Sequence, residues 1–201
     1  MLTAIVATHE SEQTLVPTLS ALVAGATSGL LRDVIVADSG SRDATAEVAD
    51  FAGCRFMAAE GPLGARLRTA AATAKGRWLL FLPAGSVLSS DWTAATERFI
   101  AEAERTGRAD AQVTSFAAAF RPAPADSVAR PALAELAALL RRRFGRTPHP
   151  AQGLLIARAF YDALGAHAAT ADADTALLRR IGRRRLVLLP ATASWRGSQD
   201  T

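Results

Sequence analysis

Residues 34–45 read VIVADSGSRDAT, and this stretch decides the fold class of the 201-residue chain. Residues 33–38 form a near-continuous apolar run that ends at Asp38, which is typical of a strand buried in a parallel sheet. A polar turn follows, and Asp43 can then cap a helix over residues 44–52. A strand, a tight turn and a helix in direct succession form the repeating unit of α/β folds.

The same unit recurs on both sides of this stretch. Upstream, residues 2–7 predict a strand, and residues 11–24 carry leucines at helical spacing. Downstream, the pattern predicts strands over 55–58, 77–82, 111–119, 153–157 and 186–189, and helices over 65–74, 91–105, 131–144, 158–164 and 172–181. We therefore expect an α/β fold of one domain over residues 1–201, with a mixed, mostly parallel sheet flanked by helices.

Composition excludes several classes of protein. With 50% hydrophobic and 21% charged residues and a mean hydropathy of +0.14, the chain is too apolar for intrinsic disorder, and it has no apolar run of membrane-spanning length. No basic segment precedes the first strand, so a secretory signal is not expected. A single cysteine, Cys54, excludes an internal disulfide and a cysteine-based zinc site. These features predict a cytoplasmic protein.

Charge is divided unevenly along the chain. Residues 1–120 hold 10 basic and 13 acidic side chains, a net of −3, whereas residues 121–201 hold 13 and 6, a net of +7. A basic half suits anionic partners such as nucleotides or phospholipid headgroups, but no motif of aromatic and basic residues indicates nucleic-acid binding. The expected helix ends at Arg141–Arg143 and Phe144, and the helix dipole stabilises cations at such an end. The alternative is peripheral contact of this segment with a membrane surface.

Three segments together resemble family 2 glycosyltransferases of the GT-A fold, a Rossmann-like fold of nucleotide-diphospho-sugar transferases. Residues 7–12 (ATHESE) are similar to the family's opening PTYNEE segment, and residues 70–82 to the helix, turn and strand that precede its metal motif. Residues 34–45 match the family's VIVVDDGSTDGT at Asp38, Gly40, Ser41, Asp43 and Thr45. The resemblance covers nearly the whole chain. It implies a nucleotide-sugar donor of the UDP or GDP type, an acceptor that the sequence does not identify, and transfer with inversion.

The nucleotide side of the site falls in residues 1–86. In sheets of this kind, ligands bind beyond the carboxyl ends of the strands. The resemblance implies that Asp38 recognises the nucleoside and that Thr8, Glu10 and Ser39 line the same pocket. The alternative for Asp38 is a structural one, in which its carboxylate stabilises the turn that follows.

The family's metal motif is missing. Where the family has Asp-x-Asp after the fourth strand, this chain has Pro83, Ala84, Gly85 and Ser86. Hard divalent cations need oxygen ligands, so we expect no protein-bound metal, and Mg²⁺ or Mn²⁺ only through the nucleotide's own phosphates. The diphosphate would then rest on Arg66 and Arg68 at the start of a helix, after a glycine at position 64 that permits close approach of a ligand.

The acceptor side falls in residues 87–201. Residues 151–158 (AQGLLIAR) resemble a DQGIFV segment of one bacterial branch, which implies that Gln152 and Gly153 contact the sugar or acceptor. Trp195 is a candidate sugar platform, whereas His167 has no supporting partner in the sequence.

Asp172 falls on the Asp of the family's Glu-Asp helix start, the general base that takes the acceptor's proton. The alternative is that Asp172 or Asp174 only caps the helix. Carboxylates of the family pattern are also replaced at positions 83, 85, 151 and 171, which favours a second hypothesis, a catalytically inactive homologue that binds nucleotide or protein.

Overall fold

The computed structural model describes residues 1–109, 115–123 and 148–195, and within them the strands join one sheet in the order β3-β2-β1-β4-β7-β6-β8-β5. The strands are β1 (Leu2–Thr8), β2 (Leu31–Asp38), β3 (Arg55–Ala58), β4 (Trp78–Pro83), β5 (Ser86–Leu88), β6 (Ala117–Pro122), β7 (Leu154–Ala157) and β8 (Leu186–Trp195). The helices are α1 (Glu12–Thr27), α2 (Thr45–Phe51), α3 (Leu63–Thr73), α4 (Trp92–Ala109), α6 (Arg158–Ala163) and α7 (Ala173–Ile181), with the 3-10 turns η1 (Pro150–Gln152) and η2 (Arg183–Arg185).

Parallel strands form the first half of the sheet. β1 lies between β2 and β4, and β3 continues the sheet beyond β2. Nearly every residue of β1 and β4 is buried, as strands covered on both faces require. The predicted alternation of strands and helices in this half is confirmed.

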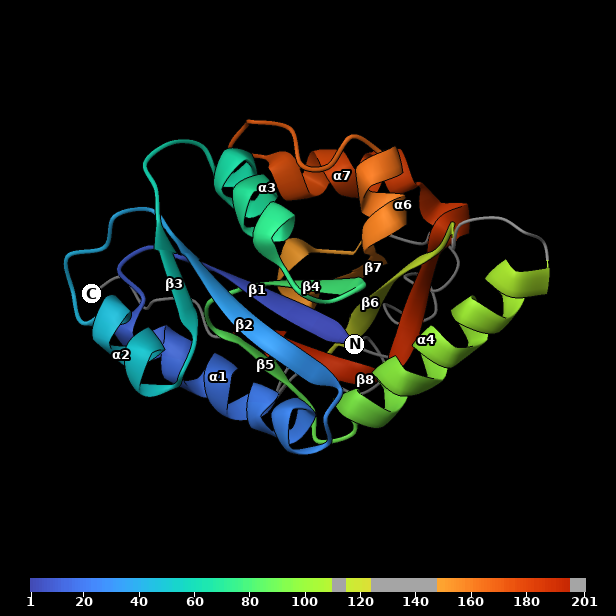
Figure 1. The fold of residues 1–201 in the computed structure, drawn as a ribbon, viewed down its shortest axis with the longest axis horizontal. Helices are drawn as coiled ribbons and strands as arrows, with labels where there is room; N and C mark the ends of the chain where they lie inside the picture. The colour runs from blue at the N-terminus through green and yellow to red at the C-terminus, as the bar shows by residue number, and fades with distance from the viewer. Residues whose placement is uncertain (110–114, 124–147, 196–201) are drawn as a thin grey trace, which may run out of the picture.

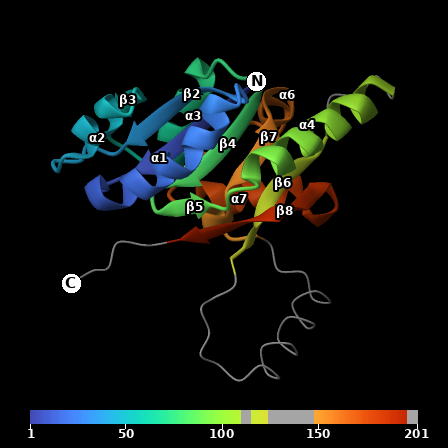
Figure 2. The ribbon, with the colours of Figure 1, turned by 90° about the horizontal axis from the view of Figure 1, so that it is seen from below.

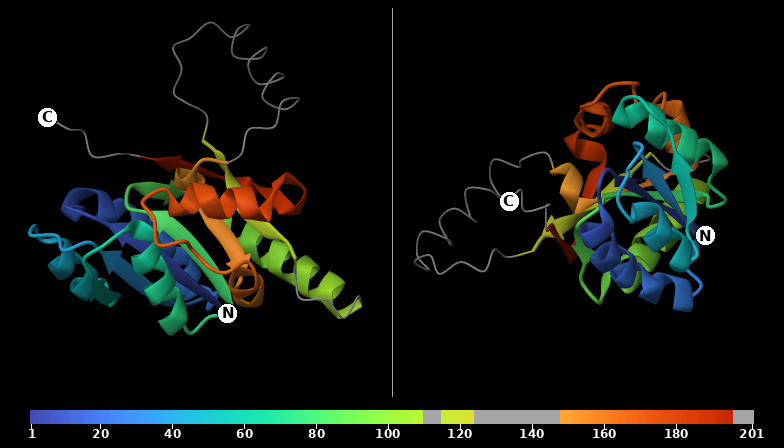
Figure 3. Two further views of the ribbon diagram at one scale, coloured as in Figure 1. Left: turned by 90° about the horizontal axis from the view of Figure 1, so that it is seen from above. Right: turned by 90° about the vertical axis from the view of Figure 1, so that its left-hand side faces the viewer.

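Helices cover both faces of the sheet. In Figure 1, α3, α6 and α7 lie above the sheet and α1, α2 and α4 lie below it. Seen from below in Figure 2, α1 and α4 lie in front of the strands, and seen from above in the left view of Figure 3, the orange α7 lies in front of them. The second half of the sheet adds β7 antiparallel to β4, and pairs β6 with β8 in parallel. The prediction of a mixed, mostly parallel sheet flanked by helices is therefore confirmed.

β8 departs from the prediction, which ended this strand at Leu189. The observed strand continues to Trp195, and its register with β6 shifts after Phe120, so that Pro190 lies at a bulge. Proline lacks an N–H, and a bulge is a place where a sheet tolerates that loss. The continuation pairs with β5, a strand that the sequence analysis did not predict, and sets Trp195 opposite Ser86.

Some predicted elements lie outside the described residues. The helix expected over 131–144, with its arginines and the membrane contact based on them, is one of these, and the strand expected over 111–119 is described from residue 117 onward as β6. Among the helices that the structure does describe, none is long and apolar enough to cross a membrane.

Candidate functional site

The carboxyl ends of β1, β2 and β4 lie side by side at one edge of the sheet. Thr8 ends β1 opposite Asp38 at the end of β2, and Pro83 ends β4 opposite Ala7. The segments that the sequence analysis singled out at these strand ends therefore meet, as parallel strands require. This edge is the candidate site.

The Asp38 carboxylate is buried and fully occupied by hydrogen bonds. Oδ1 accepts from Oγ1 of Thr8 at 2.7 Å and from Oγ of Ser41 at 2.6 Å, and Oδ2 accepts from the backbone N–H groups of Gly40 and Ser41, both at 2.7 Å. A carboxylate offers about four acceptor positions, so these bonds use all of them. Burial on its own raises the pKa of Asp38, but the bonds from Ser41, Thr8 and Gly40 outweigh it and bring the pKa below its usual value.

The turn that Asp38 organises is tied to the segment after β1. The backbone N–H of Glu10 donates to Oγ of Ser41 at 2.8 Å, and Oε1 of Glu10 accepts from the N–H of Arg42 at 2.9 Å. The N–H of Ser39 donates to the carbonyl oxygen of Thr8 at 3.2 Å. One network thus brings together the nucleotide-side residues predicted from the sequence: Thr8, Glu10, Ser39 and Asp38. These bonds match the structural alternative for Asp38, and its direct contact with a nucleoside stays a prediction.

Arg66 reaches the same edge from α3. Its Nη1 donates to the carbonyl oxygens of Thr8 at 3.2 Å and of Ala37 at 2.8 Å. Burial lowers the pKa of the Arg66 guanidinium, and the charge of Asp38 opposes that lowering. Its Nε is buried without a hydrogen-bond partner among the described residues. The guanidinium therefore fixes a positive charge at the ends of β1 and β2, where a diphosphate is expected.

Arg68 does not share a cradle with Arg66. Residues two apart on a helix face in different directions. Arg68 is exposed, and its charge acts on Tyr161 of α6: burial raises the pKa of this phenol to about 12, and Arg68 opposes the rise. The predicted joint binding of a diphosphate by the two arginines is therefore not supported by their placement.

Gly64 permits the close approach of a chain segment and not of a ligand. A Cβ at this position would lie 1.7 Å from the carbonyl oxygen of Ala168 and 2.6 Å from the Cβ of Ala173. The N–H of Gly64 also donates to the carbonyl oxygen of Thr170 at 3.1 Å. The glycine is thus required where α3 packs against the segment that leads into α7, and the expectation that it admits a ligand is wrong.

The loop after β4 does not fit a divalent cation. Pro83, Ala84 and Gly85 carry no ligating side chain, and the hydroxyl of Ser86 is buried and donates to the carbonyl oxygen of Ala151 at 3.2 Å. Within the described ranges, no group of three or more His, Cys, Asp or Glu side chains could hold a metal ion. Mg²⁺ and Mn²⁺ need several oxygen ligands, so these residues are no substitute for the family's metal motif.

Trp195 lies beside this loop. Its Nε1–H donates to the carbonyl oxygen of Ala84 at 3.2 Å, and 55% of the residue is exposed. An indole held at one end and open on its face can stack on a sugar ring. Its role as a sugar platform stays a prediction, and its position at the strand-end edge is compatible with that role.

A small pocket lies between the end of β4 and helices α3 and α7. Its volume is about 20 Å³, which is room for about one water molecule. Most of its lining is apolar, and the two polar side chains that line it are His149 and Asp174. The pocket therefore brings a carboxylate to the edge where β4 ends.

Asp174, and not Asp172, lines this pocket. Asp172 is exposed at the N-cap of α7, and its side chain makes no capping hydrogen bond with the described residues. The Asp174 side chain is 24% exposed and lies on the helix face of the buried Leu177, Leu178 and Ile181. The general-base role of Asp172 stays a prediction, and the geometry makes Asp174 a second candidate for that role.

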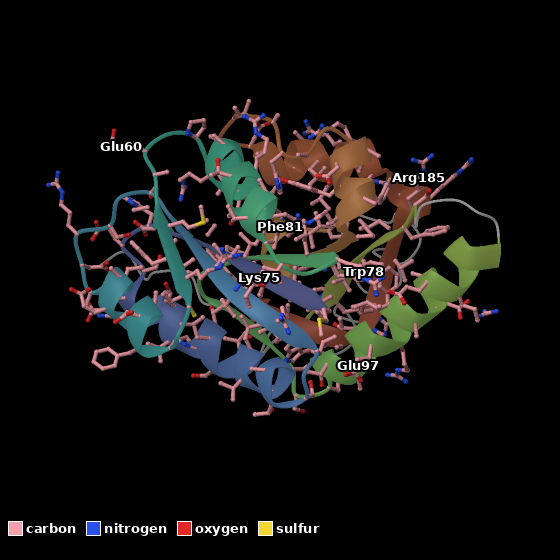
Figure 4. The ribbon with its side chains drawn as sticks, in the orientation of Figure 1. Glu60, Lys75, Trp78, Phe81, Glu97 and Arg185 are labelled. Atoms are coloured by element: carbon pink, nitrogen blue, oxygen red, sulfur yellow. The ribbon has the colours of Figure 1, made fainter. Side chains whose placement is uncertain are left out.

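His167 has two partners, contrary to the expectation from the sequence. Its imidazole is 0% exposed, with Nε2 3.0 Å from Oδ1 of Asp174 and Nδ1 2.9 Å from the hydroxyl of Tyr161. The ring of Phe81, which Figure 4 labels on β4, packs edge-on against the imidazole at 4.7 Å between centroids. No sequence motif links residues 161, 167 and 174, so only the packing of α6 and α7 reveals this network.

Gly153 lines the pocket, and Gln152 holds His149, which also lines it. Oε1 of Gln152 accepts from the N–H of His149 at 2.8 Å, and its Nε2 donates to the carbonyl oxygen of Phe120 at 2.6 Å. Gly153 has a φ of 71°, and a Cβ there would lie 2.7 Å from Cδ2 of Leu82. Both residues hold backbone in place, and their contact with sugar or acceptor stays a prediction.

Comparison with known families decides what this edge belongs to. Residues 3–156 match the family model described as Glycosyl transferase family 2. The chain belongs to this family. The matched region contains the Asp38 turn, Arg66 and the loop after β4, which the sequence analysis placed in the nucleotide half of the chain. No curated protein matches the chain at a significant level.

Solved structures show that this family 2 chain has the GT-A fold. S. aureus TarS 1-349 superposes with a TM-score of 0.68 at 14% identity, covering 96% of this chain and 60% of that one. Glucosyl-3-phosphoglycerate synthase from Mycobacterium tuberculosis was solved with Mn²⁺, UDP and glucosyl-3-phosphoglycerate. It superposes with a TM-score of 0.63 at 18% identity, covering 98% of this chain and 72% of that one. Mannosyltransferase PcManGT from Pyrobaculum calidifontis, solved with GDP-Man and Mn²⁺, superposes with a TM-score of 0.70 at 18% identity, covering 96% of this chain and 56% of that one. This chain thus spans about 60% of the length of the TarS fragment.

Proposed function

We propose that the chain binds a nucleoside-diphosphate sugar of the UDP or GDP type and transfers the sugar, with inversion, to a hydroxyl group of an acceptor. The observation that carries the proposal is Asp174, a partly buried carboxylate that lines a pocket where β4 ends. Membership of family 2 supports transferase chemistry. Structures of similar fold that hold UDP-GlcNAc or GDP-Man support the class of donor.

The nucleotide is expected to rest on the turn after β2. Asp38 would act by holding this turn, with Thr8, Glu10 and Ser39 beside it. Arg66 would face the diphosphate, because its guanidinium is fixed at the ends of β1 and β2. In this proposal residues 1–86 supply the nucleotide side, and residues 87–201 supply the acceptor side.

Asp174 would act as the general base. In a transfer with inversion, the acceptor oxygen attacks the anomeric carbon from the face opposite the diphosphate. A new bond forms between that oxygen and the carbon, the acceptor's proton passes to Asp174, and the bond to the diphosphate oxygen breaks with its electron pair leaving on the diphosphate. General-base catalysis of this kind contributes about 10²- to 10⁴-fold.

Charge on the leaving diphosphate would be met by Arg66 and not by a protein-bound metal. The similar structures of the synthase and of PcManGT hold Mn²⁺, but Pro83 and Gly85 give this chain no ligand at the corresponding loop. A metal clamp contributes several kcal/mol to the transition state of such reactions. We therefore expect slow transfer that EDTA does not abolish.

Calorimetry with UDP, GDP and ADP, each with Mn²⁺ or with EDTA, tests the donor. UDP or GDP is expected to bind, with an affinity that Mn²⁺ changes less than tenfold beyond its effect on the free nucleotide. If neither UDP nor GDP bound, or if binding required Mn²⁺, the proposed site would be wrong. Incubation with labelled UDP- or GDP-sugars and an acceptor panel then tests transfer.

A second function, nucleotide binding without transfer, is favoured by one observation: the loop of residues 83–86 has no carboxylate. In that case UDP or GDP binds, the labelled sugar stays on its donor, and hydrolysis of the donor is not accelerated. Release of sugar by the wild type at a rate that Asp174→Asn lowers would exclude this second function.

A further inference from the structure

The turn that carries His167 is strained and clamped. Ala166 has a φ of 56°, in the left-handed region that is unfavourable for residues other than glycine. Arg180 of α7 holds this turn, because its Nη1 donates to the carbonyl oxygen of Leu164 at 2.7 Å and its Nη2 to that of Ala166 at 2.5 Å. The position of the His167 imidazole is therefore fixed by the bonds that join the turn after α6 to α7.

The hydrogen bonds around Tyr161 determine where the imidazole carries its proton. The backbone N–H of His167 donates to the Tyr161 hydroxyl oxygen at 3.2 Å, and Tyr161 is 1% exposed. The Tyr161 O–H must then find an acceptor, and among its contacts in the described residues Nδ1 of His167, at 2.9 Å, is the atom that can accept. Nδ1 is thus unprotonated, and the proton of a neutral imidazole lies on Nε2.

An imidazolium would break this arrangement. With protons on both nitrogens, Nδ1–H and the backbone N–H of His167 would both donate to the Tyr161 oxygen, and the buried O–H of Tyr161 would lose its acceptor. Burial raises the pKa of Tyr161 to about 12, so this phenol keeps its proton at neutral pH. The neutral imidazole with Nε2–H therefore satisfies each polar atom of the network.

We propose that His167 is a positioning residue for Asp174, donating from Nε2–H to Oδ1 and so fixing the carboxylate with its exposed part in the pocket. The inference rests on the proposed function of Asp174 as the base. A carboxylate held by one oxygen keeps the other free to accept a proton at a set angle, and small displacements of reacting groups slow catalysis strongly. The two rings of Phe81 and Tyr161 exclude water from the imidazole.

The charged groups around the network come from three helices. Asp174 on α7 accepts from the imidazole. Asp162 on α6 raises the pKa of Tyr161, and Arg68 on α3 lowers it. Phe81 on β4, which packs against the imidazole, is apolar. The clamp residue, Arg180, bonds to backbone carbonyls and not to the imidazole. Among the described residues, the carboxylate of Asp174 is thus the charged group that is hydrogen-bonded to His167.

Imidazole ¹⁵N NMR tests the hydrogen-bond direction without any turnover. The chain has three histidines, and His9→Gln and His149→Gln assign the other two. At neutral pH, His167 is expected to carry its proton on Nε2, and Asp174→Asn is expected to shift the Nε2 resonance. A proton on Nδ1 would overturn the inference, because Nε2 could then not donate to Asp174.

Kinetics test the positioning role. His167→Phe fills the space but cannot donate, and we expect kcat to fall about 100-fold with the donor KM unchanged. His167→Gln offers an amide N–H and is expected to recover most of the loss, which a space-filling role would not produce. If His167→Phe did not fold, Tyr161→Phe would serve instead, because it removes the hydroxyl that holds Nδ1 and is expected to lower kcat about tenfold.

The outcomes separate this inference from the proposed function. Wild-type kcat in His167→Phe, together with a large loss in Asp174→Asn, would overturn the positioning role and leave the proposed function standing. If the wild type transferred no sugar at all, the proposed function would fail, and the positioning role for a reaction would fail with it. The Nε2–H bond to Asp174 would in that case be judged by the NMR result alone.

Discussion

The two carboxylates at the strand-end edge are used in opposite ways. Asp38 has its acceptor positions filled by Thr8, Gly40 and Ser41, whereas Asp174, within the described part of the chain, is bonded to His167 and lines a pocket. A buried carboxylate whose bonds are complete holds backbone in place. A carboxylate held by one oxygen beside a pocket can still accept a proton. In the proposed function, Asp38 therefore holds the turn on the nucleotide side, and Asp174 is the reactive group on the acceptor side.

The two sides are joined where α3 meets the segment before α7, and the largest effect on stability is expected there. Gly64→Ala would place a Cβ 1.7 Å from the carbonyl oxygen of Ala168, so we expect a loss of about 3 kcal/mol or more in the free energy of unfolding. Gly61→Ala is the matched control, since its φ is 113° with open space around it, and should lose about 1–2 kcal/mol. Thermal melts compare the stabilities of the two variants. Equal losses in the free energy of unfolding would mean that the two sides are not packed together through Gly64.

Asparagine at each carboxylate sharpens the contrast. Asp38→Asn should lower the free energy of unfolding by about 3 kcal/mol, because an amide cannot accept all the bonds that the carboxylate accepts. Asp174→Asn should lose about 1 kcal/mol, since it affects one hydrogen bond at a partly exposed side chain. Urea denaturation measures both. A loss at Asp174 as large as that at Asp38 would contradict the division into a structural and a reactive carboxylate.

Acid should erase the structural contribution of Asp38. Hydrogen bonds bring its pKa in the folded protein below the usual value, so the stabilisation is complete above the usual pKa of an unfolded Asp, about 3.9, and is lost as the pH falls through the folded pKa. The stability difference between wild type and Asp38→Asn is therefore expected to be constant from neutral pH to about pH 5 and to shrink below about pH 4. Urea midpoints at each pH measure it, and a difference that grows in acid would refute this assignment.

Trp195 should give the smallest effect. Trp195→Ala removes the exposed aromatic face, and we expect about 1 kcal/mol weaker binding of the donor sugar, with binding of UDP or GDP alone unchanged. Trp195→Phe keeps an aromatic face and loses the bond to Ala84. Its affinity for the donor sugar should therefore lie between those of wild type and Trp195→Ala. Calorimetry with nucleotide and nucleotide sugar separates these cases. An equal loss for both ligands would place the indole against the nucleotide.

The strand, turn and helix around Asp38 could be predicted from the sequence because they follow one another directly in the chain. The stretch from residue 33 to 45 contains its own strand, turn and helix start, and Asp38 bonds to residues two and three positions ahead. The continuation of β8 past Pro190 could not be predicted, since it depends on a bulge against β6. In the same way, β5 is too short to show a pattern of its own.

The acceptor side could be predicted only in outline. The spacing of Asp174 to Leu177, Leu178 and Ile181 was the signal that this acid shares the buried helix face, whereas Asp172 does not. The family motif instead points to Asp172, and which of the two acids is the base stays a prediction. The partnership of His167 with Asp174 depends on a turn with a positive φ at Ala166, which a sequence pattern does not reveal.

The central claim is that the reactive carboxylate is Asp174, and sugar transfer by two asparagine variants tests it most directly. Asp174→Asn in α7 and Asp172→Asn at its N-cap make the same chemical change two residues apart. We predict that Asp174→Asn lowers kcat about 10³-fold while Asp172→Asn stays within about twofold of wild type, and that both bind UDP or GDP as wild type does. Equal rates in the two variants, or a loss confined to Asp172→Asn, would contradict the account.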